Sequence, residues 1–149
     1  METFLIQNKK QTESLAKMLA KACLAEVRTM SEQRRKILKH ALVFGFTGNL
    51  GAGKTTFIQS FAKGLGIRSR LTSPTFVLMK KYENLFHFDC YRIKDYKDIL
   101  ALDFAEIIDE PKNIIVIEWA EKIRKILPKD TVWIKFKILV KDKRRIEIS

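Results

Sequence analysis

The sequence predicts an α/β domain of three layers, in which helices cover both faces of a mainly parallel central sheet. Two apolar runs of strand length, ALVFGF at 41–46 and NIIVIEW at 113–119, lack the alternation of a strand with one solvated face. Such runs are typical of central parallel strands that are buried on both faces. The final segments TVWIKFKILV and RRIEIS alternate as the strands of an antiparallel hairpin do. With no internal repeat and no low-complexity linker, residues 1–149 are expected to form one domain with a C-terminal antiparallel hairpin.

The composition is that of a globular protein with a basic surface. A chain of 149 residues that is 46% hydrophobic and 31% charged is long enough to bury a core. No apolar stretch approaches the roughly 18 residues that a membrane span needs. The N-terminal METFLIQNKK lacks the pattern of a secretory leader. Cys23 and Cys90 have no metal-ligand spacing and are expected to be small buried side chains in a reducing cytosol. These features predict a cytoplasmic protein without membrane contact.

The net charge of +12 leaves two interpretations open. A basic surface attracts polyanions, which favours RNA or an acidic protein as a partner; the alternative is the solvated surface of a lysine-rich protein. The sequence lacks the aromatic residues between basic ones that RNA-binding proteins use. The basic residues concentrate in two groups, which are Arg34, Arg35, Lys36 and Lys39, and Lys141, Lys143, Arg144 and Arg145.

The N-terminal part predicts a strand, a helix and a connector before the first central strand. Residues 3–6 are strand-like, and Thr12 is expected to cap the helix that follows. Residues 25–40 are predicted to be a polar, basic connector with some helical potential. The apolar stripe of the helix consists of Leu15, Met18, Leu19 and Ala22 at helical spacing.

The segment after the first central strand predicts a glycine-rich loop and a helix. This helix is expected at 56–65, ending at Gly66, which suits a helix C-terminus. Its buried side chains are expected to be Phe57, Ile58, Phe61 and Leu65.

The middle of the chain predicts further strands and helices in alternation. Residues 75–81 are rich in strand-forming side chains, and LFHFDCY alternates so that Leu85, His87 and Asp89 share one face. Helices are predicted at 95–109 and at 120–127, the latter ending before a proline.

The loop GNLGAGKTT fulfils the pattern Gly-x4-Gly-Lys-[Ser/Thr] with Gly48, Gly53, Lys54 and Thr55. It lies between a buried strand and an amphipathic helix, the context that separates a phosphate-binding loop from a chance match. Glycines let backbone N–H groups converge on phosphate oxygens, and the helix N-terminus adds a partial positive charge. Lys54 suits the β- and γ-phosphates, and the Thr55 hydroxyl suits a magnesium ligand. The sequence therefore predicts a P-loop NTPase-like domain.

A magnesium nucleotide also needs a carboxylate from a neighbouring strand. Glu118 ends the apolar strand IIVIE, and Asp89 ends HFD one strand earlier. A single carboxylate at a strand end is often only solvated. Two of them in a chain with a phosphate-binding loop favour a site for magnesium and an attacking water.

Four segments together resemble one protein family. GNLGAGKTTF, LTSPTFVL, HFDCYR and IEWAE occur in the order and approximate spacing of the TsaE family, also called YjeE, of bacterial tRNA threonylcarbamoyladenosine biosynthesis ATPases. The resemblance runs from near Thr12 to the final hairpin. The phosphate-binding loop alone is shared by many families, whereas its combination with SPTF, HFD-x-YR and EW is highly specific.

The resemblance implies a small ATPase that binds and hydrolyses Mg-ATP. In that family the hydrolysis supports formation of N6-threonylcarbamoyladenosine at position 37 of tRNAs that read codons beginning with A. The implied partner is the TsaD–TsaB complex, whose transferase cycle the ATPase sustains, and any tRNA contact is expected through that complex. The family does not itself make the carbamoyl bond.

The resemblance also implies roles for particular residues. Lys54, Asp89 and Glu118 would be catalytic, with Asp89 orienting or deprotonating the attacking water. Magnesium would be held by Thr55 and Glu118. Residues 72–75 match the family's switch-like loop beside the γ-phosphate. The phosphates would be held by Gly51, Ala52, Gly53, Lys54, Thr55 and Thr56.

Three departures from the family concern its surface and partner contacts. Asn49 stands where an acidic residue is usual, Ala120 stands where proline is frequent, and the connector at 25–40 is long and basic. Neither the adenine-contacting residues nor the oligomeric state follows from the motifs.

Several residues near the motifs keep alternative interpretations. Trp119 is either a nucleotide sensor or a packing residue, and His87 either relays a proton to Asp89 or is structural. Tyr91 and Arg92 would support the switch-like loop or the partner interface, and Arg92 is also a candidate charge stabiliser.

Other functional classes fit the sequence less well. A small-molecule kinase would need an arginine-rich lid, and a GTPase would need Asn-Lys-x-Asp and Asp-x-x-Gly motifs; neither feature is present. An RNA-binding module would not need Lys54, Thr55, Asp89 and Glu118 together.

Overall fold

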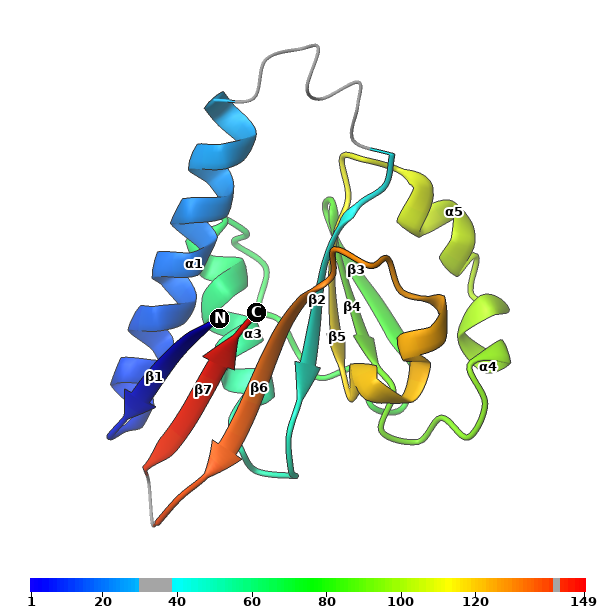
Figure 1. Ribbon diagram of the computed structural model, residues 1–149. Helices are drawn as coiled ribbons and strands as arrows, with labels where there is room; N and C mark the ends of the chain where they lie inside the picture. Colours follow the sequence, from blue (N-terminus) through cyan, green and yellow to red (C-terminus); the bar gives the residue numbers. More distant parts are fainter. Residues whose placement is uncertain (30–38, 141–142) are drawn as a thin grey trace.

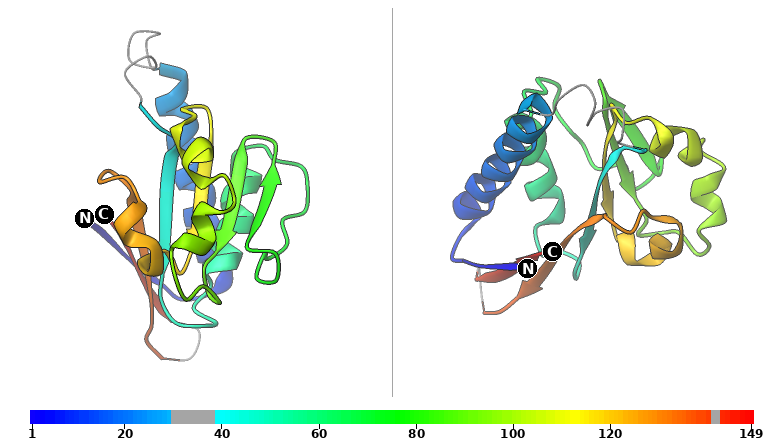
Figure 2. Two further views of the ribbon diagram at one scale, coloured as in Figure 1. Left: turned by 90° about the vertical axis from the view of Figure 1, so that its right-hand side faces the viewer. Right: turned by 45° about the horizontal axis from the view of Figure 1, so that its top comes forward.

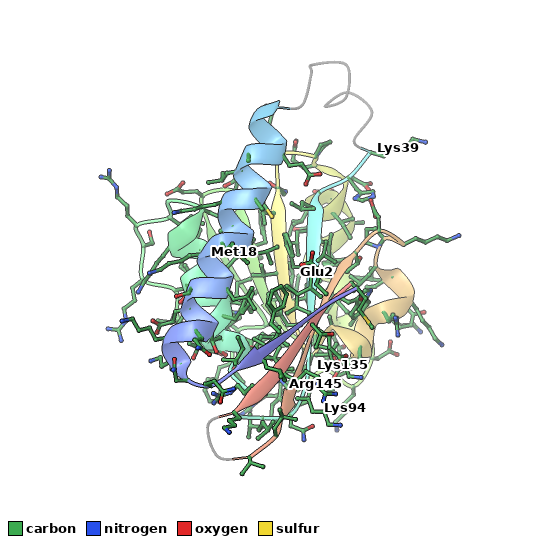
Figure 3. The ribbon with its side chains drawn as sticks, turned by 60° about the vertical axis from the view of Figure 1, so that its left-hand side comes forward. Glu2, Met18, Lys39, Lys94, Lys135 and Arg145 are labelled. Atoms are coloured by element: carbon green, nitrogen blue, oxygen red, sulfur yellow. The ribbon has the colours of Figure 1, made fainter. Side chains whose placement is uncertain are left out.

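The fold was analysed in a computed structural model, which describes residues 1–29, 39–140 and 143–149. Arg34, Arg35, Lys36 and Lys141 of the two basic groups lie outside the described residues. Lys94 and Lys135 are exposed, and Arg145 is half-buried (Figure 3).

The described residues form a seven-stranded sheet with the strand order β1-β7-β6-β2-β5-β4-β3 (Figure 1). Strands β6, β2, β5 and β4 run parallel in its centre, whereas β3 pairs antiparallel with β4 at one edge. At the other edge β7 pairs antiparallel with both β6 and β1, which confirms the C-terminal hairpin. The strand bounds are Glu2–Ile6 (β1), Leu42–Thr47 (β2), Met79–Tyr82 (β3), Leu85–Asp89 (β4), Ile114–Glu118 (β5), Val132–Ile138 (β6) and Arg144–Ile148 (β7).

Helices cover both faces of this sheet, which confirms the predicted three-layer α/β class (Figures 1 and 2). Helices α1 and α3 pack together on one face, and α4, α5 and the 3-10 helix η1 lie on the other. Among the described residues, no helix is both long enough and apolar enough to cross a bilayer. The helix bounds are Lys9–Thr29 (α1), Lys54–Gly64 (α3), Lys97–Leu100 (α4), Phe104–Asp109 (α5) and Ala120–Ile126 (η1).

Strand β2 is apolar throughout because both of its faces are buried. Phe44 and Phe46 enter the core beneath α1 and α3, whereas Val43 enters the core beneath α5 and η1. The ring of Phe44 meets that of Phe61 edge to face with centroids 4.9 Å apart, a favourable aromatic geometry. Cys23 and Cys90 are buried, as expected, and burial raises the pKa of Cys90 to about 12.

Strand register brings the functional strand ends to one edge of the sheet. Phe46 of β2 lies opposite Glu118 of β5, and Glu118 lies opposite Asp89 of β4. The loop that follows β2 therefore starts beside both carboxylates. In open α/β sheets ligands bind at the carboxyl ends of the strands, so this register defines where a site can form.

The N-terminal helix differs from its prediction in start, length and buried face. It begins at Lys9, and Asn8 caps it, because the Asn8 Oδ1 accepts the N–H of Gln11 at 3.0 Å; Thr12 is not the cap. The helix continues to Thr29, so the first part of the expected connector is helical, and residues 30–38 lie outside the described residues.

The buried face of α1 is also rotated from the predicted stripe. Met18 is 56% exposed (Figure 3). Ala22 is also exposed, whereas Ala16 and Ala20 are completely buried. Small side chains on this face let α1 approach α3 closely, so packing distance decides which residues are buried.

Three later segments are less regular than predicted. Residues 75–78 form a turn rather than a strand, because Leu78 adopts a left-handed backbone (φ 64°) and β3 starts only at Met79. The helix expected at 95–109 is split into α4 and α5 by Asp103 (φ 56°). The break lets Ile99 and Phe104 both reach full burial. The segment after β5 is a 3-10 helix instead of an α-helix.

The close approach of α1 and α3 predicts a cost for any side chain at Gly64. A Cβ there would lie 2.6 Å from the Cβ of Ala20 and 3.1 Å from the Cα of Lys17. Overpacking costs ~1–3 kcal/mol, and the higher helix propensity of alanine returns at most ~1 kcal/mol. Gly64→Ala is therefore expected to lower the free energy of unfolding, measured by urea denaturation, whereas Lys63→Ala on the exposed side of α3 should leave it nearly unchanged. Equal stability of both variants would contradict the packing argument.

Candidate functional site

The loop between β2 and α3 has a backbone that depends on glycine. Gly48 has φ 128°, and a Cβ there would lie 2.4 Å from the carbonyl oxygen of Phe136. Gly53 precedes the first turn of α3 in a left-handed conformation with φ 102°, which L side chains rarely adopt. The loop thus turns sharply into the N-terminus of α3, where free N–H groups favour an anion.

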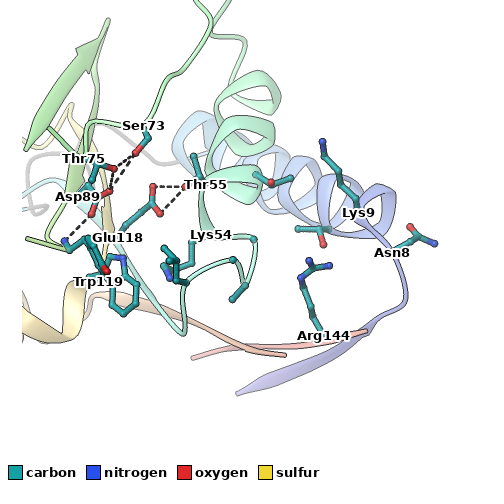
Figure 4. Close-up of a pocket in the computed structure, with 17 residues that line it drawn as sticks. Asn8, Lys9, Lys54, Thr55, Ser73, Thr75, Asp89, Glu118, Trp119 and Arg144 are labelled. Atoms are coloured by element: carbon teal, nitrogen blue, oxygen red, sulfur yellow. Dashed lines mark hydrogen bonds between the residues drawn. The ribbon is translucent and has the colours of Figure 1, made fainter. Parts of the chain in front are cut away.

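A cavity of about 620 Å³ lies over this loop (Figure 4), a size in the range of small-molecule sites. Its lining falls into three parts. The acidic end comprises Thr55, Ser73, Thr75, Asp89 and Glu118; the loop itself contributes Leu50, Gly51, Ala52, Gly53, Lys54 and Thr56; and the α1 end comprises Asn8, Lys9, Thr12 and Arg144. Tyr91 and Trp119 complete the lining.

Glu118 is the centre of the acidic end. Its carboxylate, 4% exposed, accepts hydrogen bonds from the Thr55 hydroxyl at 3.0 Å and 2.9 Å, one to each oxygen. The ring Nε2 of the fully buried His87 lies 2.9 Å from Glu118 Oε1. His87 therefore contacts Glu118, and this contact favours the structural alternative for His87 over the relay to Asp89.

The Thr55 and Glu118 pair has the chemistry of a shared magnesium site. Magnesium prefers oxygen ligands and is usually held by one or two carboxylates together with substrate phosphates. Within the described ranges no group of three or more His, Cys, Asp or Glu side chains gathers as in a self-sufficient metal centre. The donor set therefore fits an ion that arrives with a phosphate ligand.

Lys54 is a buried cation held by its own loop. Its Nζ donates to the carbonyl oxygens of Gly48 and Asn49, the latter at 3.1 Å. The same atom lies 4.0 Å from the centroid of the Trp119 ring, a cation–π contact. Burial lowers the pKa of Lys54 below its ordinary value of 10.5, and the negative charge of Glu118 opposes this effect. A phosphate would supply the strong anionic partner that this ammonium group lacks at the loop.

Asp89 ties the segment 72–77 to the end of β4. Thr75 Oγ1 donates to Asp89 Oδ2 at 2.7 Å, with the Ser73 hydroxyl at 3.4 Å from the same oxygen. The backbone N–H of Tyr91 donates to Asp89 Oδ1 at 2.9 Å. These hydrogen bonds hold the Asp89 carboxylate in one position in the acidic end of the cavity.

The structure separates the remaining candidates. Trp119 both lines the cavity and packs, because its ring lies under Lys54 and 5.1 Å from the ring of Tyr91. Arg92 is absent from the cavity lining among the described residues, and its guanidinium lies 4.5 Å from the centroid of the Phe76 ring. This contact favours the alternative in which Arg92 supports the segment 72–77 over the one in which it stabilises charge in the cavity.

Sequence reasoning missed the α1 end of the cavity. Thr12 was expected to be a helix cap and Arg144 only part of a basic group. The two residues become neighbours of the loop because β1 pairs with β7, with Ile6 opposite Arg144. No local motif encodes such a long-range pairing, so only the sheet topology could have identified these residues.

The comparisons with known proteins identify a family. The model of the family described as "Threonylcarbamoyl adenosine biosynthesis protein TsaE" matches residues 6–146. The tRNA threonylcarbamoyladenosine biosynthesis protein TsaE of Bacillus subtilis is 36% identical over 128 residues, which are 83% of this chain and 79% of that protein. The protein of the same name from Rickettsia prowazekii is 32% identical over 148 residues, which are 96% of this chain and 91% of that protein.

A solved structure extends the similarity to the fold. The crystal structure of YdiB from Bacillus subtilis aligns with a TM-score of 0.72 and 30% sequence identity. The alignment covers 99% of this chain and 83% of that one. Both the predicted resemblance and the predicted fold class are confirmed by these comparisons.

The contacts of Asp89 predict that it restrains the segment 72–77. Asp89→Ala removes the acceptor of the Thr75 and Ser73 hydroxyls and should speed amide hydrogen exchange in this segment about tenfold, as expected for the loss of one or two hydrogen bonds. Exchange measured by mass spectrometry should stay unchanged in Asp95→Ala, which removes an exposed carboxylate that accepts the local N–H of Lys97. Unchanged exchange at 72–77 in Asp89→Ala would contradict this restraint.

Proposed function

Because this chain belongs to the TsaE family, we propose that it is a P-loop ATPase of tRNA threonylcarbamoyladenosine biosynthesis. It binds and hydrolyses Mg-ATP and thereby sustains the transferase cycle of a TsaD–TsaB complex in the cytoplasm. The product of that cycle is N6-threonylcarbamoyladenosine at position 37 of tRNAs that read codons beginning with A. Any contact with tRNA is made through the complex.

The observation that carries this proposal is the arrangement of three side chains around the loop. Thr55 contacts Glu118, and Asp89 lies opposite Glu118 in the sheet register at the same strand edge. Phosphoryl transfer to water needs a phosphate cradle, a metal and a group that positions the water. The loop, the Thr55–Glu118 pair and Asp89 have the chemistry for these three tasks.

Each residue has a distinct role in the proposed reaction. Lys54 leaves the loop carbonyls and neutralises charge on the β- and γ-phosphates, while the N–H groups of residues 51–56 hold the phosphate oxygens. Thr55 and Glu118 would hold magnesium, which supplies a Lewis acid that withdraws charge from the phosphate oxygens. Asp89 orients the attacking water and accepts its proton. Ser73 and Thr75 keep the Asp89 carboxylate in position.

The lining of the cavity also supports the proposal that the rate of ATP hydrolysis depends on a partner protein. The acidic end contains no arginine among the described residues, and Arg144 lies on the other side of the loop (Figure 4). An arginine placed against the transferred phosphate accelerates such reactions by about 10³–10⁵-fold, and in many systems a partner supplies it. The isolated protein is therefore expected to turn over slowly.

The assigned roles predict different defects for three variants. Lys54→Ala should weaken nucleotide binding by about 10–100-fold, because a charge-assisted contact to phosphate is lost. Glu118→Ala should mainly reduce magnesium-dependent turnover. Asp89→Asn should retain nucleotide binding and lower the hydrolysis rate about 100-fold or more, because the amide keeps the shape but cannot accept a proton.

Calorimetric ATP titrations and phosphate-release assays over a range of magnesium concentrations separate these effects. The control is Glu106→Ala, which removes an exposed carboxylate on α5 and should behave like the wild type. Wild-type hydrolysis by Glu118→Ala would show that its assigned role is wrong.

If a partner completes the site, TsaD–TsaB should accelerate ATP hydrolysis by orders of magnitude. Single-turnover ATP hydrolysis should be measured for the isolated protein and for the reconstituted complex at matched salt. Matched salt matters because the protein is basic and electrostatic association depends on ionic strength. Equal rates, together with no nucleotide-dependent association, would favour an autonomous hydrolase or kinase over the proposed function.

A further inference from the structure

His87 is a polar residue in the middle of a strand that is buried along its whole length. It lies between Phe86 and Phe88 in β4, and none of its surface is exposed. A leucine of similar size would fill this position without adding a polar atom that must find a partner. Packing alone therefore does not account for an imidazole at this position.

The two ring nitrogens of His87 have different surroundings. Nε2 lies 2.9 Å from Oε1 of Glu118, whereas the buried Nδ1 has no hydrogen-bond partner among the described residues. An ionised carboxylate can only accept, so Nε2 carries a proton and donates it. Buried polar atoms are normally paired, and a histidine that served the fold alone would be expected to pair both nitrogens. His87 pairs only the nitrogen that faces Glu118.

The donors around Glu118 are distributed unequally between its two carboxylate oxygens. Oε1 accepts from His87 and from the Thr55 hydroxyl, at 2.9 Å and 3.0 Å, whereas Oε2 accepts only from the Thr55 hydroxyl, at 2.9 Å. A carboxylate has about four acceptor sites, two on each oxygen. The contacts of the described residues therefore occupy both sites of Oε1 and leave one site on Oε2. Glu118 lines the cavity, so this remaining site can serve a ligand there.

The sheet register limits how His87 can act on the cavity. Val116 of β5 lies opposite His87, and Glu118, two residues further along β5, is on the same face of the sheet. Asp89 shares this face, but its carboxylate accepts from the segment 72–77 and from Tyr91. His87 is not one of the residues that line the cavity. Any effect of His87 on a ligand must therefore pass through Glu118.

We propose that His87 is a positioning residue for the magnesium ion of the bound nucleotide, because its Nε2–H occupies Oε1 of Glu118 and leaves Oε2 as the oxygen that Glu118 offers to the ion. The assignment rests on the proposed nucleotide-binding function. Groups that hydrogen-bond a ligating side chain fix its orientation, and their loss typically lowers metal affinity by about 10–100-fold. Without His87, Glu118 would keep its charge but not this single orientation.

Metal binding can be measured without hydrolysis. The probe is Mn²⁺, which accepts the same oxygen ligands as Mg²⁺ and is followed by electron paramagnetic resonance. It is titrated into protein that is saturated with a non-hydrolysable ATP analogue. His87→Leu removes the donor at similar size and should weaken Mn²⁺ binding about tenfold or more. His87→Gln places an amide N–H at a similar reach and should stay close to the wild-type affinity.

Two further measurements separate positioning from a role in the fold or in the loop. In EDTA, both variants should bind the analogue like the wild type, because the loop that holds the phosphates is unchanged. In hydrolysis assays, the Mg²⁺ concentration that gives half of the maximal rate should rise about tenfold in His87→Leu. The rate at saturating Mg²⁺ should approach that of the wild type.

His40→Leu is the matched control. His40 is a partly buried histidine that also contacts a carboxylate, Asp130 at 3.1 Å, but it does not line the cavity. Its replacement should change none of these values. If His87→Leu does not fold, the comparison of His87→Asn with His87→Gln decides. The shorter amide of asparagine cannot reach Glu118, so only His87→Asn should lose affinity for Mn²⁺.

The outcomes distinguish failure of the positioning role from failure of the proposed function. If the wild type does not bind the analogue, or binds it without taking up Mn²⁺, the proposed magnesium-nucleotide function is wrong and the positioning role falls with it. If His87→Leu or His87→Asn binds Mn²⁺ like the wild type, or if His87→Gln loses as much affinity as His87→Leu, only the positioning role is wrong. Weaker binding of the analogue in EDTA would also overturn it, because His87 would then support the loop.

Discussion

The site depends on the hydrogen bonds of one buried carboxylate. Glu118 is the last residue of the central strand β5. Both of its carboxylate oxygens accept hydrogen bonds from the Thr55 hydroxyl, and Oε1 also contacts His87 Nε2. The three residues come from α3, β4 and β5, so the carboxylate links the helix behind the loop to two neighbouring strands. A buried carboxylate is tolerated only when donors surround it, which explains why a histidine occupies a fully buried position in β4.

The burial of Lys54 beneath the loop destabilises its charged form, and an anionic ligand would offset this effect. Lys54 is 4% exposed, and this burial lowers its pKa, whereas the negative charge of Glu118 opposes the shift. The folded state therefore disfavours the charged ammonium more than the unfolded chain does. Folding stability should rise with pH in the window between the lowered pKa and the unfolded value of 10.5, because the unfolded chain binds more protons there. A phosphate beside Lys54 favours the charged form and works in the opposite direction.

The parts of the site that were predictable from sequence are those encoded by local order. Gly48 to Thr56 form one continuous loop and helix start. Asp89 and Glu118 are the last residues of two apolar strands, so parallel pairing was sufficient to bring them together. The errors arose where a tertiary contact overrides local preference. Leu78 takes a left-handed conformation that is rare for its residue type, and Asp103 takes one that aspartate tolerates without requiring it. Ala16 and Ala20 are buried because α3 lies against them.

The α1 end of the cavity escaped prediction for a different reason. Its residues lie at opposite ends of the sequence, and only the antiparallel addition of β7 and β1 to a parallel sheet brings them to the loop. A glycine-rich loop with strand-end carboxylates occurs in proteins with many different ligands, so these features alone do not specify one ligand. The extension by β6, β7 and β1 adds a second wall, with Arg144 and the first turn of α1 on it. The parallel centre of the sheet thus positions the loop and the two strand-end carboxylates, and the antiparallel edge positions Arg144, so the two ends of the cavity differ in charge.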